Sequence, residues 1–99
     1  SKNLTTIKRG AFSECSGITK FNVVSTKLNS MGKYALYRTG KLKTVIFKTG
    51  YLTKSNVGSK AFSGIKSTAT FTVPAGSVQN YKDLFKSKGA GSKFKVKSL

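Results

Sequence analysis

Residue types that usually carry out catalysis are scarce in this sequence. Histidine is absent, and the only acidic residues are Glu14 and Asp83. A Ser-His-Asp triad needs a histidine, and a hydrolytic carboxylate pair needs two acids side by side. A catalytic lysine would need a buried site that lowers its pKa, and the sequence gives no sign of one. We therefore predict a protein that is not an enzyme.

The sequence also lacks the residues of a metal or cofactor site. Cys15 is the only cysteine, so the chain can form neither an internal disulfide nor a cysteine metal cluster. We expect this thiol to be a small buried hydrophobe. The segment at residues 89–91, Gly-Ala-Gly, does not have the spacing of a phosphate-binding loop. We predict no metal and no cofactor.

Positive charge dominates the surface chemistry. Nineteen Lys and Arg against two acids give a formal charge of +17, which attracts polyanions. The lysines are spread along the whole chain, so they form either a specific anion site or a generally solvated surface. Tyr34, Tyr37 and Tyr51 are candidates for stacking on nucleic-acid bases, although the frequent partial burial of tyrosine favours packing on an outer turn. The sequence leaves both alternatives open.

The chain is long enough for one hydrophobic core. It has 99 residues, of which 37% are hydrophobic, and no apolar run approaches the roughly 18 residues of a membrane span. Residues 1–9 lack the apolar block of a signal peptide, and the first residue is not methionine. We expect a processed or excised piece of a longer protein.

An internal repeat positions the side chains. An apolar residue is followed four positions later by alanine at residues 7–12, 31–36 and 57–62, in steps of 24 and then 26. Two large apolar residues follow each alanine by ten and twelve positions: Phe21 and Val23, Val45 and Phe47, Phe71 and Val73. This register predicts repeats that bury their apolar rows by stacking on one another.

The alternation within each repeat predicts parallel strands near residues 19–24, 43–47 and 70–73. Their inward side chains belong to a predicted core of Ile7, Phe12, Phe21, Val23, Leu28, Met31, Val45, Phe47, Phe62, Phe71 and Val73. Their outward side chains should share one sheet face, with lysines toward both edges and hydroxyls between them. We predict a ligand-binding face made by Lys20, Asn22, Thr44, Lys48, Thr70, Thr72, Lys93, Lys95 and Lys97.

The two ends of the chain differ. The Val-Pro-Ala-Gly turn at 73–76 ends three repeats in residues 1–76, and residues 77–99 should cap them. Ser77 is the predicted N-cap of a helix over 78–88 that ends at Gly89, and Phe94 and Val96 predict a final strand. No capping sequence precedes Leu4, so we expect this edge to fray over residues 1–9 or to self-associate.

Three segments resemble a known family. They are Gly-Ala-Phe-Ser-Glu-Cys-Ser-Gly-Ile at 10–18, Ala-Phe-Ser-Gly at 61–64 and Phe-Thr-Val-Pro-Ala-Gly-Ser-Val-Gln-Asn-Tyr at 71–81. They resemble BspA-like leucine-rich repeats from about Leu4 to the end of the chain. Leu36 in place of the usual Phe, Thr39 in place of a second Cys, the insertion in the third repeat and the high charge depart from that pattern.

The resemblance implies a mainly β solenoid: a short right-handed coil of parallel strands with one C-terminal helix and a final capping strand. It implies a secreted or surface-exposed bacterial protein that serves as a binding or adhesion module through its exposed sheet. Its partner would then be a host or bacterial surface protein. The alternative is a basic protein that binds a polyanion, either nucleic acid, glycosaminoglycan or an anionic wall polymer. The family has no shared catalytic or ligand residues to transfer to this chain.

Overall fold

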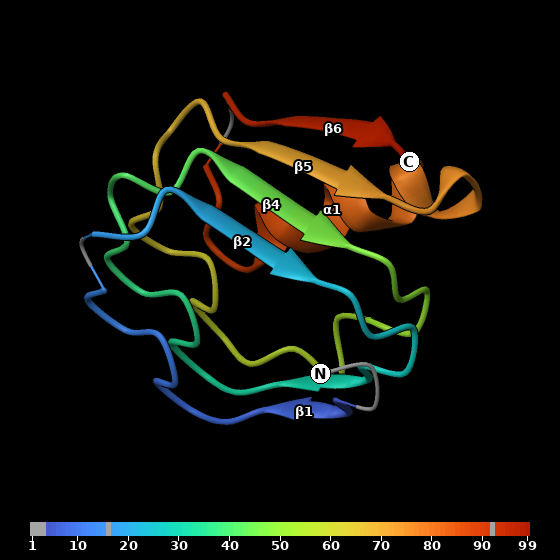
Figure 1. The fold of residues 1–99 in the computed structure, drawn as a ribbon, viewed down its shortest axis with the longest axis horizontal. Coiled ribbons are helices and arrows are strands. Elements are labelled where there is room, and N and C mark those ends of the chain that lie inside the picture. Colours follow the sequence, from blue (N-terminus) through green and yellow to red (C-terminus); the bar gives the residue numbers. More distant parts are fainter. Residues whose placement is uncertain (1–3, 16, 92) are drawn as a thin grey trace.

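The computed structural model describes residues 4–15, 17–91 and 93–99. It contains short parallel strands and a single α-helix of the described chain near the C-terminus (Figure 1). The elements are β1 (Thr6–Ile7), β2 (Lys20–Val23), β3 (Ser30–Met31), β4 (Thr44–Phe47), β5 (Thr70–Val73), the 3-10 turn η1 (Ala75–Ser77), α1 (Val78–Ser87) and β6 (Lys95–Ser98). The strands predicted near 19–24, 43–47 and 70–73 are confirmed.

The strands form two parallel ladders, and the chain passes alternately from one to the other. One ladder pairs β1 with β3 and continues through a bridge from Met31 to Val57. The other is a four-stranded sheet in the order β2-β4-β5-β6. In Figure 1 the sheet lies above and the small ladder below. We refer to each passage through both ladders as a coil: coil 1 is residues 4–27, coil 2 is 28–51 and coil 3 is 52–76.

The turns at one side of the molecule repeat the same strained backbone. Two positions in each turn have a positive φ, which L-residues rarely adopt. These positions are Gly10, Tyr34 and Lys60, with φ of 66°, 61° and 58°, and Glu14, Arg38 and Gly64, with φ of 58°, 59° and 82°. Because most of these residues are not glycine, the conformation must be imposed by stacking of the turns.

Backbone hydrogen bonds supply that stacking. The N–H groups of Gly10, Phe12 and Glu14 donate to carbonyls of coil 2 at 3.0, 2.9 and 2.7 Å. The equivalent groups of coil 2 donate in the same way to coil 3, where the acceptors are Ser59, Ala61 and Ser63. The three coils are therefore copies of one unit, as the spacing predicted.

Two glycines show how closely the coils approach. A Cβ added at Gly32 would lie 2.2 Å from the backbone nitrogen of Arg9, and one added at Gly58 would lie 2.3 Å from that of Lys33. Real Cβ atoms do not come this near to a backbone. Glycine is thus required here because the preceding coil occupies the space of a side chain.

The predicted core is confirmed except at two positions. Nine of the eleven predicted residues are buried, and they belong to one cluster between the two ladders. Phe12 and Phe21 are only half-buried. Both belong to coil 1, where no further coil within the described residues covers them. Cys15, predicted to be buried, is likewise half-buried in coil 1.

Buried hydroxyl groups join the end of each of the first two coils to its own beginning. The Ser25 hydroxyl donates to the carbonyl of Leu4 at 2.6 Å, and the Thr49 hydroxyl donates to that of Leu28 at 2.6 Å. Ser25 and Thr49 are 24 residues apart, so they are one repeat position. Each satisfies a carbonyl of the same coil that would otherwise be left without a partner in the interior.

The C-terminal segment covers the open end of coil 3. Phe85 of α1 stacks on Phe71 of β5, with ring centroids 4.0 Å apart. Gly89, with φ of 101°, ends the helix, and the Ala90 N–H bonds to the Phe85 carbonyl in a Schellman arrangement. Ser77 is the N-cap residue, as predicted, although its hydroxyl makes no capping hydrogen bond. Strand β6 then pairs with β5 in parallel.

Candidate binding face on the four-stranded sheet

The register of the sheet aligns the predicted outward residues in rows. Lys20, Thr44, Thr70 and Lys95 form one row across β2, β4, β5 and β6. Asn22, Ile46, Thr72 and Lys97 form the next row. The row between them, which contains Phe21, Val45 and Phe71, points to the core because side chains alternate along a strand. The structure thus brings seven of the nine predicted site residues onto one face.

The chemistry of this face changes from its centre to its edges. The central side chains of β4 and β5, which are Thr44, Ile46, Thr70 and Thr72, are half-buried. The lysines of the outer strands are exposed and lie about 14 Å apart, three strand spacings. The result is a centre of threonine and isoleucine between two cationic edges. We call these two rows the sheet face.

The two remaining predicted residues lie outside the rows. Lys48 follows the end of β4 and continues the alternation, so it extends the sheet face at its C-terminal side. Lys93 is exposed but precedes β6 by two residues and has no place in the strand register. Val24 and Leu99, which sequence reasoning did not single out, follow β2 and β6 and are 41% and 58% exposed.

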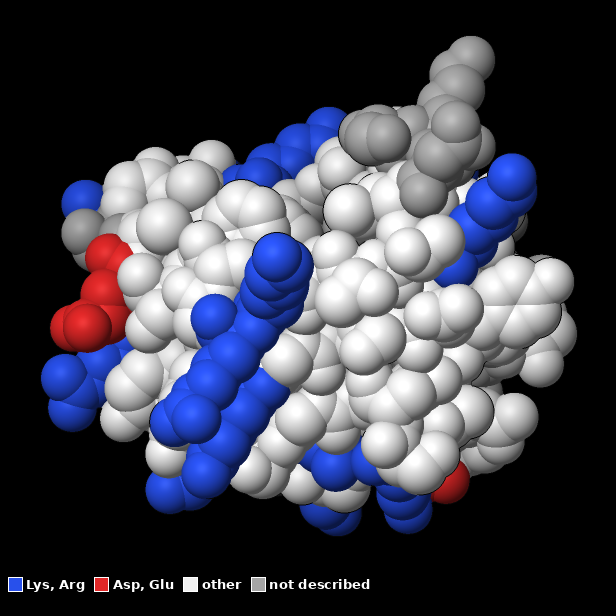
Figure 2. Space-filling view, turned by 90° about the horizontal axis from the view of Figure 1, so that it is seen from below, with Lys and Arg blue, Asp and Glu red and all other residues white. Residues whose placement is uncertain are grey.

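Positive charge is not restricted to the sheet face. Figure 2 views the molecule from the side of the β1–β3 ladder, and lysine and arginine side chains also occur there, next to a broad uncharged area. The one ion pair among the described residues joins Arg38 to Glu14 at 3.9 Å, and both side chains are largely exposed. Such a pair contributes little to stability. Net charge alone therefore does not define a site.

The tyrosines outside the core divide into two kinds. Tyr34 and Tyr37 are half-buried, and their rings pack edge to face with centroids 4.9 Å apart. Cationic groups of Arg9 and Lys33 lie 5.9 and 5.2 Å from the Tyr34 ring. These contacts support packing on an outer turn, and an open hollow of about 450 Å³ lies beside them. Tyr51 is 63% exposed.

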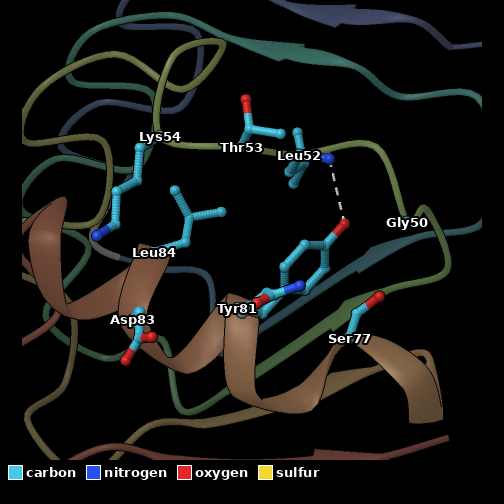
Figure 3. A pocket seen from close by; sticks show the side chains of 9 residues that line it. Gly50, Leu52, Thr53, Lys54, Ser77, Tyr81, Asp83 and Leu84 are labelled. Carbon is cyan, nitrogen blue, oxygen red and sulfur yellow. Dashed lines mark hydrogen bonds between the residues drawn. The ribbon is translucent and has the colours of Figure 1, made fainter.

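A second hollow, of about 320 Å³, lies between the loop at 50–54 and α1 (Figure 3). The Tyr81 hydroxyl at its floor donates to the Thr49 carbonyl at 2.6 Å and accepts from the Leu52 N–H at 3.2 Å. Burial raises the pKa of Tyr81 above its ordinary value of 10.0, while the Leu52 hydrogen bond lowers it by less. These bonds join the cap to Thr49 of coil 2 and to Leu52 of coil 3. The sequence pattern gave no indication of these hydrogen bonds.

Neither hollow contains the groups needed for metal chemistry. Within residues 4–15, 17–91 and 93–99, no three His, Cys, Asp or Glu side chains come together as possible ligands of a metal ion.

In the part of the chain that the structure describes, no helix is long and apolar enough to cross a membrane.

The stacked turns, the two parallel ladders and the helical cover define a repeat protein that presents a sheet. Residues 1–98 match the model of the BspA type leucine-rich repeat region, with six copies. The chain therefore belongs to the BspA-type leucine-rich repeat family. No curated protein and no solved structure shows significant similarity to it.

Proposed function

We propose that this protein is a non-enzymatic binding module whose sheet face docks an acidic partner protein at a cell surface. Repeats of this family generally serve protein binding or adhesion and are typically surface-associated. In this proposal residues 1–76 supply a right-handed solenoid with the binding surface, and residues 77–99 supply the cap.

The arrangement of the two rows carries the proposal. Protein interfaces commonly have a centre depleted of charge and a polar rim. The sheet face has this pattern, because Thr44, Ile46, Thr70 and Thr72 are central while the lysines stand at its edges. Carboxylates at the rim of a partner would pair with those lysines and accelerate association.

A polyanion is the competing ligand, and the sheet face suits it less well. A nucleic acid or glycosaminoglycan is bound along a continuous cationic track, often with exposed aromatic rings. Here no aromatic side chain lies in either outward row, and the lysines of the two edges are separated by uncharged strands. The overall charge of +17 nevertheless gives any polyanion a nonspecific attraction.

Charge reversal tests the sheet face against net charge. One variant changes Lys20, Lys48, Lys95 and Lys97 to Glu; the control variant changes Lys54, Lys60, Lys82 and Lys86 to Glu. All eight side chains are exposed, and the two variants have the same net charge. The probes are poly-L-glutamate, which supplies the carboxylates of an acidic protein, and heparin, which is a sulfated polyanion, both titrated at several salt concentrations.

We expect the sheet-face variant to weaken poly-L-glutamate binding at least tenfold more than the control variant does. Heparin should be weakened similarly by both, because its attraction is diffuse. Equal losses of poly-L-glutamate binding would contradict the proposal. A loss for heparin alone, confined to the sheet-face variant, would assign the face to a sulfated polyanion such as a glycosaminoglycan.

A further inference from the structure

Coil 3 departs from the repeat at one loop. Leu28 precedes Met31 by three residues in coil 2, whereas Leu52 precedes Val57 by five in coil 3. All four side chains are buried, so the two extra residues must lie in the loop between Leu52 and Val57. This loop borders the hollow of about 320 Å³ beside α1 (Figure 3). Because insertions in single repeats often build binding surfaces, we searched this hollow for a ligand site.

Hydrogen bonds of Asn56 give this loop a defined shape. Its Oδ1 accepts from the Thr53 N–H at 2.7 Å, and its Nδ2 donates to the Tyr51 carbonyl at 2.8 Å. The Thr53 and Ser55 hydroxyls share a further hydrogen bond at 3.0 Å. A preformed loop favours binding, because less conformational entropy is lost when a ligand is bound. The loop side of the hollow is therefore preorganised.

The hollow combines an apolar floor with polar groups. Leu52 from the loop and Tyr81 and Leu84 from α1 line it, and all three are buried. Ser77 and Asn80 line it as well, and the Ser77 hydroxyl makes no capping bond to α1. Small-molecule sites commonly have apolar walls, a few polar groups and volumes of about 300–1,000 Å³. The hollow has this composition and lies at the lower end of that range.

Two opposite charges line the hollow without pairing to each other. Lys54 comes from the loop and Asp83 from α1 (Figure 3). Among the described residues, the one ion pair within 4.0 Å is that between Arg38 and Glu14. Gln79, one turn before Asp83, donates to its Oδ1 at 3.3 Å. In a chain with 19 Lys and Arg, this carboxylate therefore has no cationic partner in the described part of the molecule.

These two charges favour a ligand that carries both signs. A simple amine would pair with Asp83, but the net charge of +17 repels it. A simple carboxylate would pair with Lys54, but Asp83 repels it from the same hollow, and lysines elsewhere on the surface compete for it. A zwitterion has no net charge and satisfies both groups. An α-amino acid is such a zwitterion, and an apolar side chain on it would suit the floor.

We propose that this hollow binds a free α-amino acid with an apolar side chain. Its ammonium group would pair with Asp83, its carboxylate with Lys54, and its side chain would cover Leu52 and Leu84. The site is separate from the sheet face, because none of its nine lining residues belongs to β2, β4, β5 or β6.

Four small ligands test which groups are recognised. L-Leucine carries all three groups, whereas N-acetyl-L-leucine lacks the ammonium, L-leucinamide lacks the carboxylate and glycine lacks the side chain. Each is titrated into the ¹⁵N-labelled protein at physiological salt, and the amide shifts of Leu52 and Leu84 report binding. We expect L-leucine to bind in the millimolar range, as suits a ligand of this size, and at least about tenfold more tightly than the other three.

Two neutral substitutions assign the charges. Asp83→Asn should weaken L-leucine binding at least about tenfold and leave that of N-acetyl-L-leucine within about threefold, because this ligand has no ammonium. Lys54→Gln should weaken L-leucine equally and leave L-leucinamide within about threefold. Glu14→Gln and Lys41→Gln are the matched controls, since they make the same charge changes at exposed positions that do not line the hollow. Both should bind L-leucine like the unmodified protein.

Several results would overturn the proposal. Binding of N-acetyl-L-leucine or L-leucinamide as tight as that of L-leucine would assign the hollow to one end of a peptide. Equal losses for Asp83→Asn and Glu14→Gln would show that only diffuse charge is sensed. L-Leucine that shifts neither Leu52 nor Leu84 up to its solubility limit would show that the hollow is not a site.

The same titration separates this proposal from that for the sheet face. The variant with Lys20, Lys48, Lys95 and Lys97 changed to Glu should bind L-leucine within about threefold of the unmodified protein, because the ligand has no net charge and none of these lysines lines the hollow. A loss of about tenfold or more in this variant would place the amino acid on the sheet face and contradict binding in the hollow.

Discussion

Replacing Gly58 by alanine tests the stacking of coil 3 on coil 2. The new Cβ would lie 2.3 Å from the Lys33 nitrogen and 2.5 Å from its Cα, so one backbone must move by about 1 Å to restore an ordinary contact. That movement strains the hydrogen bonds from Gly58 to Met31 at 2.8 Å and from Tyr34 to Ser59 at 3.3 Å.

The magnitude follows from these two effects. Overpacking costs about 1–3 kcal/mol, and each weakened hydrogen bond adds about 0.5–1.5 kcal/mol. We expect Gly58→Ala to lower the free energy of unfolding by about 3 kcal/mol. Gly76→Ala is the control, because no atom lies within 4 Å of the added Cβ and the backbone is not left-handed. It should change the free energy by less than about 0.5 kcal/mol.

Urea unfolding, followed by circular dichroism, measures both variants. The midpoint should fall for Gly58→Ala with an unchanged m-value, since the surface exposed on unfolding is the same. A loss below about 1 kcal/mol for Gly58→Ala would refute the close stacking of the coils. A loss for Gly76→Ala as large as that for Gly58→Ala would also refute it.

Two further predictions concern the core and the cap. Phe71→Ala should lower the free energy of unfolding by about 3–5 kcal/mol, because Phe71 is fully buried. Phe21 occupies the same repeat position but is only half-buried, so Phe21→Ala should lower it by about half as much. Equal losses in urea unfolding would contradict the partial exposure of Phe21 in coil 1. Tyr81→Phe should cost about 1–3 kcal/mol at pH 7 because the Thr49 carbonyl and Leu52 N–H lose their partner. Burial raises the pKa of Tyr81, so the stability that its neutral hydroxyl contributes is complete below pH 10 and is lost as the pH rises further. The difference in free energy of unfolding between the unmodified protein and Tyr81→Phe should therefore shrink above pH 10. A constant difference up to pH 11 would contradict this.

Most of the fold followed from the spacing of apolar residues. The alternation around Phe21, Val45 and Phe71 predicted three strands within one residue of their observed bounds. It predicted the shared face for the same reason, because the period of a strand fixes which side chains point outward. Repetition therefore predicts register well when each repeat contributes one strand.

What the sequence did not predict depends on contacts between repeats. Phe12 and Phe21 match the apolar pattern of the buried positions, yet coil 1 leaves them half-covered. Ser25 and Thr49 are 24 residues apart and make equivalent buried hydrogen bonds. The search for repeats followed apolar residues, so it did not find these two hydroxyl positions. The N-cap position of Ser77 was predicted, but whether its hydroxyl makes a capping bond depends on side-chain orientation, which a residue type alone does not determine.

The most direct test of the proposed function is to map binding residue by residue. Amide chemical shifts of the ¹⁵N-labelled protein would be followed during titration with poly-L-glutamate at physiological salt. If the sheet face is the docking site, the largest changes should fall on its two rows in β2, β4, β5 and β6, the lysines Lys20, Lys95 and Lys97 included, and those of α1 should be small. Changes spread evenly over all lysine-bearing segments, α1 included, would contradict a specific site on the sheet.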